Sequence, residues 1–317
     1  MSVYRLAFFV ALAGVVFTSC TNKTDGSPPA VAADKAPVFN AHMHGAAPGE
    51  DDAADLEAVL AEMDAAGITK SVLHISETSD IAALTAAARD RFLVGPMFPC
   101  WRAQSGEFPG CAWDDAAWPD IEWLRGEYER GTLAIMGEMT FAYADISPAD
   151  ERMDPYWALA AELDIPVAVH ISLGPPPESP LRANGRAPDF NEAFGNPALL
   201  RPVLQKYPNL RIWLQHAGFD ETIGDVDLLE ETFSLLADYP NIYVDMSALH
   251  SVTPPPVHEA AVKAFLERGF IDRVMFGSDN WAAAPIIDSY EAMAFLTEEQ
   301  KRGVFYDNAA RFFGLSE

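Results

Sequence analysis

Short apolar runs recur along the chain from residue 38 onward, and segments rich in Ala, Leu and Glu lie between them. The runs are continuously hydrophobic rather than alternating, which is typical of parallel strands that helices cover on the outside. There are eight, at residues 38–42, 71–75, 92–97, 133–139, 166–171, 210–215, 242–246 and 273–277. The pattern therefore predicts eight strand–helix units.

Residues 37–317 are long enough to hold these units in one domain, since a (β/α)8 barrel takes about 250 residues. A doubly wound open sheet is the alternative fold, and it usually has a glycine-rich phosphate turn after its first strand. The sequence after the first run, Ala41-His42-Met43-His44-Gly45, is not such a turn. We therefore expect an α/β fold of the (β/α)8 TIM-barrel type.

The first twenty residues form a unit of their own. Arg5 precedes an apolar run at residues 6–17, which suits a secretion signal but is shorter than the about 20 residues of a membrane span. The small residues before Cys20 resemble a bacterial lipoprotein signal. This resemblance implies that residues 1–19 are removed and that a lipid on Cys20 anchors the protein in the cell envelope, facing the periplasm. An ordinary cleaved signal peptide is the alternative, and both imply export. Residues 20–36, rich in Ser, Thr, Pro and Ala, predict a flexible linker.

Acidic residues far outnumber basic ones, with 47 Asp and Glu against 21 Lys and Arg and a net charge of −26. A nucleic-acid partner requires clustered basic residues, so we expect none. The acidity favours solubility.

Cys100 and Cys111 lie close together in a segment with Pro and Gly, and in an exported protein they are expected to form a disulfide.

Residues that bind metals gather where the predicted strands end. Barrel active sites form at the carboxyl ends of the strands, so these positions decide the chemistry. His42 and His44 are one residue apart and therefore share one face of a strand. The other strand-end residues of this kind are Glu138, His170, His216, Asp245 and Asp279. Because imidazoles and carboxylates are the usual ligands of catalytic zinc, we expect a metal site at the mouth of the barrel.

The order of these residues resembles that of the metal-dependent amidohydrolase superfamily, with H-x-H after strand one, His after strands five and six, and Asp after strand eight. It resembles most the amidohydrolase-related branch, which includes relatives of aminocarboxymuconate-semialdehyde decarboxylase, and residues 307–315 resemble the closing helix of that branch. The resemblance implies that His42, His44, His170 and Asp279 bind one divalent ion, with zinc expected. It also implies that Asp279 accepts a proton from the attacking water, and that His216 orients this water or stabilises the oxyanion.

Two roles remain open for Glu138. Binuclear relatives use a bridging ligand after strand four, so one role for Glu138 is the bridge to a second ion that His170 and His216 hold. Alternatively, Glu138 hydrogen-bonds a ligand or positions the substrate. The sequence does not choose between one ion and two.

Three further polar residues are expected to have structural roles. Asp245 is expected to support a neighbouring group rather than to bind metal. His74 lies within an apolar run and is expected to be a packed, hydrogen-bonded core residue. His258 opens a predicted helix and is expected at the surface.

Substrate contacts are expected from the loops that follow the strands. Arg182 and Arg186 follow strand five, where they either hold a substrate carboxylate or pair with the protein's own acids. Trp101 and Trp281 follow strands three and eight, where they either wall the substrate pocket or pack within their loops. The expected partner is therefore a small molecule.

These features together predict an exported, lipid-anchored metal-dependent hydrolase that uses an activated water on an amide, ester or lactone. Non-oxidative decarboxylation of a small carboxylate is the alternative within the same fold, because a metal can hold the substrate instead of activating water. A non-catalytic ligand-binding lipoprotein is a second alternative. A protein of that kind is expected to have lost metal-binding residues, whereas this sequence keeps all four expected ligands.

Overall fold

A computed structural model describes residues 36–44, 52–75, 90–99, 118–174, 190–279 and 281–315. These residues belong to one compact unit. Outside these ranges lie the export signal, the linker up to residue 35, and the following predicted residues: Cys20, Cys100, Trp101, Cys111, Arg182 and Arg186. What the sequence predicts for them stays a prediction. Within the described ranges no helix is long and apolar enough to cross a membrane.

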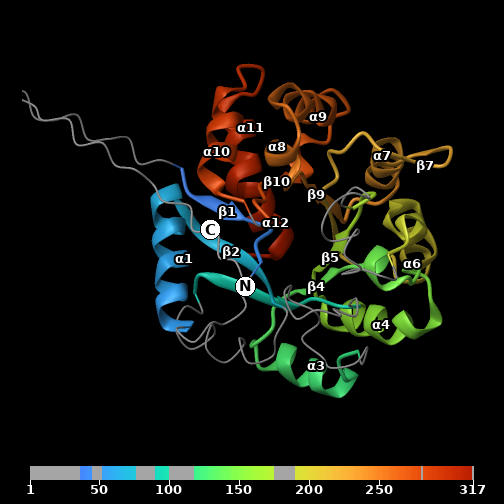
Figure 1. Ribbon diagram of the computed structural model, residues 1–317. Helices are drawn as coiled ribbons and strands as arrows, with labels where there is room; N and C mark the ends of the chain where they lie inside the picture. Colours follow the sequence, from blue (N-terminus) through green and yellow to red (C-terminus); the bar gives the residue numbers. More distant parts are fainter. Residues whose placement is uncertain are drawn as a thin grey trace, which may run out of the picture. The chain divides into compact units, whose positions relative to one another are not determined.

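Eight parallel strands form where the apolar runs predict them (Figure 1). Three pair in the order β1-β2-β3, and five in the order β10-β9-β6-β5-β4. The strands are β1 (Val38–Asn40), β2 (Ile68–Ile75), β3 (Phe92–Pro96), β4 (Met136–Met139), β5 (Val167–His170), β6 (Ile212–Gln215), β9 (Ile242–Asp245) and β10 (Val274–Met275). A short antiparallel hairpin, β7 (Thr222–Ile223) with β8 (Val226–Asp227), follows β6 and is not predicted by the apolar pattern.

Two seams join these groups of strands into a closed ring. Between β3 and β4, the Ala134 amide donates to the Val94 carbonyl at 2.9 Å. Between β1 and β10, the Ala41 amide donates to the Phe276 carbonyl at 2.7 Å. Closure removes the exposed edges that an open sheet leaves. The (β/α)8 barrel prediction is therefore confirmed, and the open-sheet alternative is wrong.

Alternate residues of the strands point into the barrel and fill it. In the amino-terminal half of the strands they are apolar and form one buried cluster: Phe39, Ala41, Val72, Ile135, Ala168, Trp213, Tyr243 and Met275. Helix α12 (Asn308–Phe313) adds Phe312 to this cluster. Two residues further along the strands the same positions become polar and stay buried, as from Trp213 to Gln215 and from Tyr243 to Asp245. The period of two thus places an apolar plug at one end and polar groups above it. His42, Glu138 and His216 each lie an odd number of residues from the plug residue of their own strand, so bends in the backbone, such as the φ of +61° at His216, bring them to the site.

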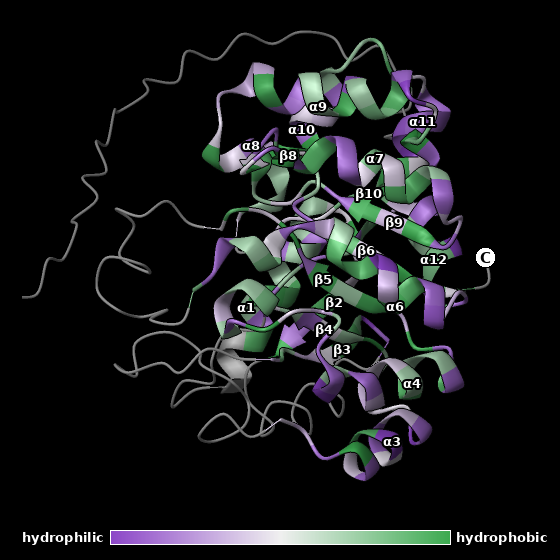
Figure 2. Cartoon of the chain, turned by 90° about the vertical axis from the view of Figure 1, so that its right-hand side faces the viewer, coloured by the Kyte–Doolittle hydropathy of each residue, from purple (hydrophilic) through white to green (hydrophobic). Residues whose placement is uncertain are grey.

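Helices surround the strands, and a second, larger apolar cluster fills the layer between them. The α-helices are α1 (Asp52–Ala66), α3 (Ile121–Glu129), α4 (Asp154–Leu163), α6 (Arg201–Lys206), α7 (Leu228–Asp238), α8 (Leu249–Val252), α9 (Pro255–Glu267), α10 (Ala283–Ala292), α11 (Glu298–Arg302) and α12. The 3-10 turns are η2 (Phe141–Ala144), η3 (Glu151–Met153), η4 (Glu192–Gly195), η5 (Pro197–Leu200) and η6 (Ile271–Arg273), and a π-helical turn, η7 (Gly303–Asp307), joins α11 to α12. In Figure 2 the central strands are mostly green, whereas the helices carry both colours, as amphipathic helices do.

The expectation that His258 lies at the surface is wrong. His258 is fully buried in the first turn of α9. Its ring packs edge-on against Tyr290 with 4.8 Å between centroids, and its Nδ1 atom lies 3.1 Å from the Ser289 hydroxyl. Both neighbours come from α10, which covers this turn from a distant part of the chain.

Gly95 in β3 marks a close approach of two strands. A Cβ added there would lie 2.6 Å from the carbonyl oxygen of Ile135, and a strand backbone cannot move aside as a flexible side chain can. We expect Gly95→Ala to lower the free energy of unfolding by about 1–3 kcal/mol, measured by urea denaturation. Gly303→Ala is the control, since its Cβ would meet no atom closer than 3.5 Å. An equal loss in both variants would contradict this explanation.

Candidate metal centre

Four imidazoles and three carboxylates meet at the carboxyl ends of the strands. They are His42, His44, Glu138, His170, His216, Asp245 and Asp279. The two most exposed side chains, His44 and Asp279, are each only 15% exposed. The structure therefore brings together every strand-end residue that the sequence singles out.

Glu138 lies between two pairs of histidines. Its Oε2 atom is 3.2 Å from His44 Nε2 and 3.9 Å from His42 Nε2. Its Oε1 atom is 2.6 Å from His170 Nδ1 and 3.6 Å from His216 Nε2. Each oxygen of the carboxylate therefore faces its own pair of imidazoles.

Asp279 approaches the same group from the chain after β10. Its Oδ1 atom is 3.2 Å from His44 Nε2 and 3.8 Å from His42 Nε2. The backbone of Asp279 has a φ of +58°, which is uncommon for a residue with a side chain. A hydrogen bond of 2.8 Å from its amide to the His42 carbonyl holds this conformation. The backbone between the first and last strands thus aims the Asp279 carboxylate at the histidines.

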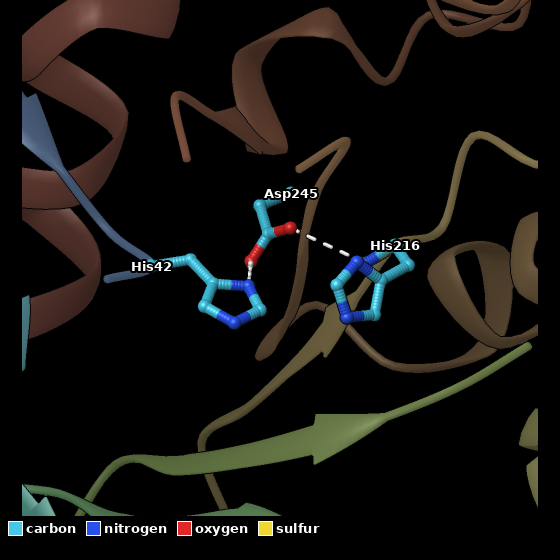
Figure 3. A group of neighbouring side chains, drawn as sticks. All are labelled: His42, His216 and Asp245. Carbon is cyan, nitrogen blue, oxygen red and sulfur yellow. Dashed lines mark hydrogen bonds and ion pairs between the residues drawn. The ribbon is translucent and has the colours of Figure 1, made fainter. Parts of the chain in front are cut away.

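Asp245 lies between His42 and His216 (Figure 3). Its Oδ1 atom accepts hydrogen bonds from the His216 amide at 3.2 Å and from the amide and hydroxyl of Ser247 at 3.0 and 2.6 Å. Its Oδ2 atom lies 3.3 Å from His42 Nδ1. The Ser247 hydroxyl, which donates to Asp245, accepts from His42 Nδ1 at 2.8 Å and so fixes the ring with Nε2 left for a metal ion. The sequence pattern does not mark Ser247, because a serine one residue past a strand end is common.

His74 lies beneath the centre, and the prediction that it is a packed, hydrogen-bonded core residue is confirmed. Its Nδ1 donates to the Gly137 carbonyl at 2.8 Å, so its Nε2 accepts from the Gln215 side-chain amide at 2.8 Å. Burial, reinforced by the neighbouring imidazoles, lowers the pKa of His74 to about 3, so the ring stays neutral. Gly137 has a φ of +102°, and a Cβ there would lie 2.6 Å from the Ala168 carbonyl oxygen. His74 and Gly137 together fix the backbone from which Glu138 projects.

The carboxylates and imidazoles alter one another's protonation. Burial opposes the charged form of each group, but hydrogen bonds to the carboxylates outweigh burial at two histidines. They raise the pKa of His44 to about 10 and that of His216 to about 9. The same contacts hold the pKa values of Glu138 and Asp279 below their usual range, despite burial. At His170 burial dominates and lowers the pKa.

This set of donors fits divalent metal ions. Buried carboxylates require charge compensation, and imidazole nitrogens with carboxylate oxygens suit zinc and similar ions. Two groups of ligand atoms, with all atoms of each group within 4.8 Å of one another, share Glu138: His42–His44–Glu138 and Glu138–His170–His216. A third group is His42–His216–Asp245, but there Oδ1 of Asp245 already accepts three hydrogen bonds.

Two aromatic side chains flank the centre. The ring of Tyr143 packs edge-on against His170 with 5.3 Å between centroids, a contact that the sequence did not reveal. Trp281 is 46% exposed and lines a cavity of about 160 Å³ together with Met43 and Asp279. The role of Trp281 as a wall for substrate stays a prediction.

Comparisons with known proteins agree with this geometry. Residues 40–315 match the family model described as Amidohydrolase. The chain is similar to a Pseudomonas putida structure provisionally named 2-pyrone-4,6-dicarboxylic acid hydrolase, with 15% identity over 89% of this chain and 99% of that one and a TM-score of 0.62. It is also similar to 2,6-dihydroxybenzoate decarboxylase from Rhizobium (16%, covering 88% and 99%, TM-score 0.54) and to 4-oxalomesaconate hydratase from Rhodopseudomonas palustris (16%, covering 87% and 95%, TM-score 0.56). At such identities these structures establish the fold alone. No curated protein matches the chain.

Metal binding should release protons. At pH 7.5 the imidazoles of His44 and His216 are protonated in the metal-free protein, because their pKa values are raised to about 10 and about 9. Ligation requires neutral imidazole, so adding Zn²⁺ to weakly buffered metal-free protein should release more than one proton per chain, measured with a pH indicator. The release should shrink as the pH rises through 9 to 10. If no protons are released at pH 7.5, the prediction is wrong. His250→Ala is the control: His250 lies outside the centre, so this variant should release as many protons as the wild-type protein.

Proposed function

The chain belongs to the amidohydrolase family, and from this premise we propose that it is a metal-dependent hydrolase acting on a lactone, ester or amide of a small carboxylated molecule. The observation that carries the proposal is the buried group of four imidazoles and three carboxylates at the mouth of the barrel. Such a group is costly to bury without cations, whereas with them it is a catalytic centre.

We propose two zinc ions, with Glu138 as the bridging ligand. The support is that the two oxygens of Glu138 face different pairs of imidazoles, at 3.2 and 3.9 Å on one side and 2.6 and 3.6 Å on the other. If Glu138 bound a single ion, only one of its oxygens would have to face a pair of imidazoles. Divalent ions held here lower the pKa of a bound water toward about 7 and polarise the carbonyl oxygen of a substrate.

The remaining ligands divide between the two positions. His42, His44 and Asp279 would hold the first ion, and His170 and His216 would hold the second. His42 has its Nδ1 against the Ser247 hydroxyl at 2.8 Å, so its Nε2 would be the ligand atom.

The protein's own groups then guide the proton and the substrate. His44 and Asp279 are the most exposed members of the centre, so the substrate approaches on their side. The Asp279 carboxylate accepts the proton of the attacking water and delivers it to the leaving group. His216 Nδ1 donates to the Ser247 carbonyl at 3.1 Å, which turns its Nε2 toward Glu138 Oε1, 3.6 Å away, where the second ion would lie.

The substrate class is inferred from the names of similar structures. A pyrone dicarboxylic acid, a dihydroxybenzoate and an oxalomesaconate are all carboxylates. We propose that Arg182 and Arg186 bind the substrate carboxylate and that Trp101 and Trp281 form an apolar wall. We also propose that the enzyme is exported and held in the cell envelope by a lipid on Cys20, with a disulfide between Cys100 and Cys111.

Non-oxidative decarboxylation is the second candidate, and the likeness to 2,6-dihydroxybenzoate decarboxylase favours it. In that reaction the metal centre binds the substrate, and Asp279 has no water to deprotonate. A non-catalytic ligand-binding role has less support, because every expected ligand stands at the centre.

Glu138→Ala tests the bridge. We expect elemental analysis to find two metal ions per chain in the wild-type protein and one or none in the variant, since both positions lose a ligand. Glu221→Ala is the control, because Glu221 is a partly buried carboxylate that accepts from the Leu173 amide and is outside the ligand groups. One ion in the wild-type protein and in Glu138→Ala alike would exclude the bridging model.

Asp279→Asn tests the proton acceptor. On a panel of lactones, esters and amides of small acids, we expect kcat to fall by about 10²- to 10⁴-fold. Asp164→Asn, an exposed carboxylate in a helix cap, should leave kcat unchanged. Reaction in ¹⁸O-labelled water should place the label in the product acid. Release of CO2 with no label in the organic product would support decarboxylation, and chelator-insensitive activity would contradict the metal-dependent mechanism.

A further inference from the structure

A second polar site lies at the opposite end of the barrel. A cleft of about 600 Å³ opens at the amino-terminal ends of β9 and β10, whereas the metal centre lies at their carboxyl ends. Its lining comes from α7, β9, η6, α12 and the turn before β9: Leu236, Ala237, Pro240, Tyr243, Asp272, Arg273 and Arg311. Helices α7 and α12 flank the two strands in Figure 2.

The two arginines of this cleft differ from the other described arginines. Eight of the ten arginines within the described ranges lie within 4.0 Å of a carboxylate: Arg91, Arg125, Arg130, Arg152, Arg201, Arg211, Arg268 and Arg302. Arg273 and Arg311 have no such ion pair with any described residue. In a chain where acids outnumber bases 47 to 21, ion-pair partners are abundant, so two arginines in the lining of one cleft without an ion pair to a described residue require an explanation.

Other contacts hold both guanidinium groups at the cleft. Arg273 donates from Nη1 to the Tyr239 carbonyl at 3.1 Å and lies over the Phe270 ring at 4.7 Å. Arg311 donates from Nη1 to the Asp272 carbonyl at 3.0 Å. A guanidinium has five N–H donors, so these contacts orient each group while leaving donors for a ligand.

The surroundings of the pair favour an anion. Burial lowers the pKa of Arg273, while the neighbouring Asp272 and Tyr243 act in the opposite direction. The Tyr243 hydroxyl lies 3.4 Å from Arg311 Nη1 and adds a third polar group to the lining. The carboxylate of Asp272 also lines the cleft but forms no ion pair with either arginine.

We propose that Arg273, Arg311 and Tyr243 form a binding site for a small oxyanion, either a phosphate or a carboxylate, that is separate from the metal centre. Guanidinium groups bind such anions through paired hydrogen bonds. Leu236 and Pro240 form an apolar wall that accommodates a short carbon chain attached to the anion. Because this end of the barrel is closed by the apolar plug, the bound anion does not reach the catalytic residues.

Calorimetric titration of the metal-loaded protein at constant ionic strength tests the site, with inorganic phosphate and succinate as probes. We expect saturable binding that weakens by about tenfold or more in Arg273→Gln and in Arg311→Gln. Arg302→Gln is the control. This substitution also removes one positive charge, from the helical segment that leads into α12, but Arg302 already pairs with Asp307. Any anion bound at the metal centre is retained in all three variants.

The outcomes separate a ligand site from a structural role. Loss of binding with unchanged turnover, and partial recovery in Arg273→Lys, supports the proposal. Tighter binding of phosphate than of succinate identifies a phosphorylated ligand, and the reverse order identifies a carboxylate. If the wild-type protein binds neither probe, or if the two glutamine variants bind as tightly as Arg302→Gln, the proposal is wrong and the arginines only tie α12 and β10 together.

Discussion

Burial of the Glu138 carboxylate among four imidazoles is the constraint on which the rest of the structure depends. A carboxylate that is 3% exposed must be compensated, and Asp245 and Asp279 add two more negative charges to the same space. Without metal ions the protein compensates by protonating His44 and His216, whose pKa values rise to about 10 and about 9. Divalent ions achieve the same compensation while leaving the imidazoles neutral, so the centre is chemically complete with cations in it.

The fold supplies this centre through the alternation of the strands and through bends at their ends. Inward positions are apolar in the half of the barrel that α12 closes and polar above it, as at His74 and His170, whereas Glu138 and His216 are out of that phase and reach the mouth because the backbone turns after the plug. Between them, His74 and Gln215 form a neutral hydrogen-bonded layer that holds the Gly137 carbonyl. Rigid support of this kind matters because small displacements of a ligand weaken metal binding.

The sequence predicted the barrel and its strand-end residues well, because strand periodicity and polar interruptions are local features. It could not predict that the two oxygens of Glu138 face different imidazole pairs, since distances between strand ends depend on packing across the barrel. It misplaced His258, because the helix that buries it is contributed by residues about 30 positions later. Arg273 and Arg311 escaped notice for the same reason, as only the folded chain shows that they share a cleft and lack carboxylate partners.

Net acidity does not prevent such a protein from binding anions. At physiological ionic strength charges act over about 8 Å, so the groups nearest a ligand dominate over a net charge of −26 spread across the chain. At the mouth, the metal ions proposed for the centre would present positive charge to the proposed carboxylated substrate. At the opposite end, Arg273 and Arg311 present it directly. Residues 273 and 279 flank the last strand, at most about 20 Å apart at about 3.3 Å per residue, so screening by the solvent weakens the interaction between the two regions. Each can therefore select its own anion within one acidic protein.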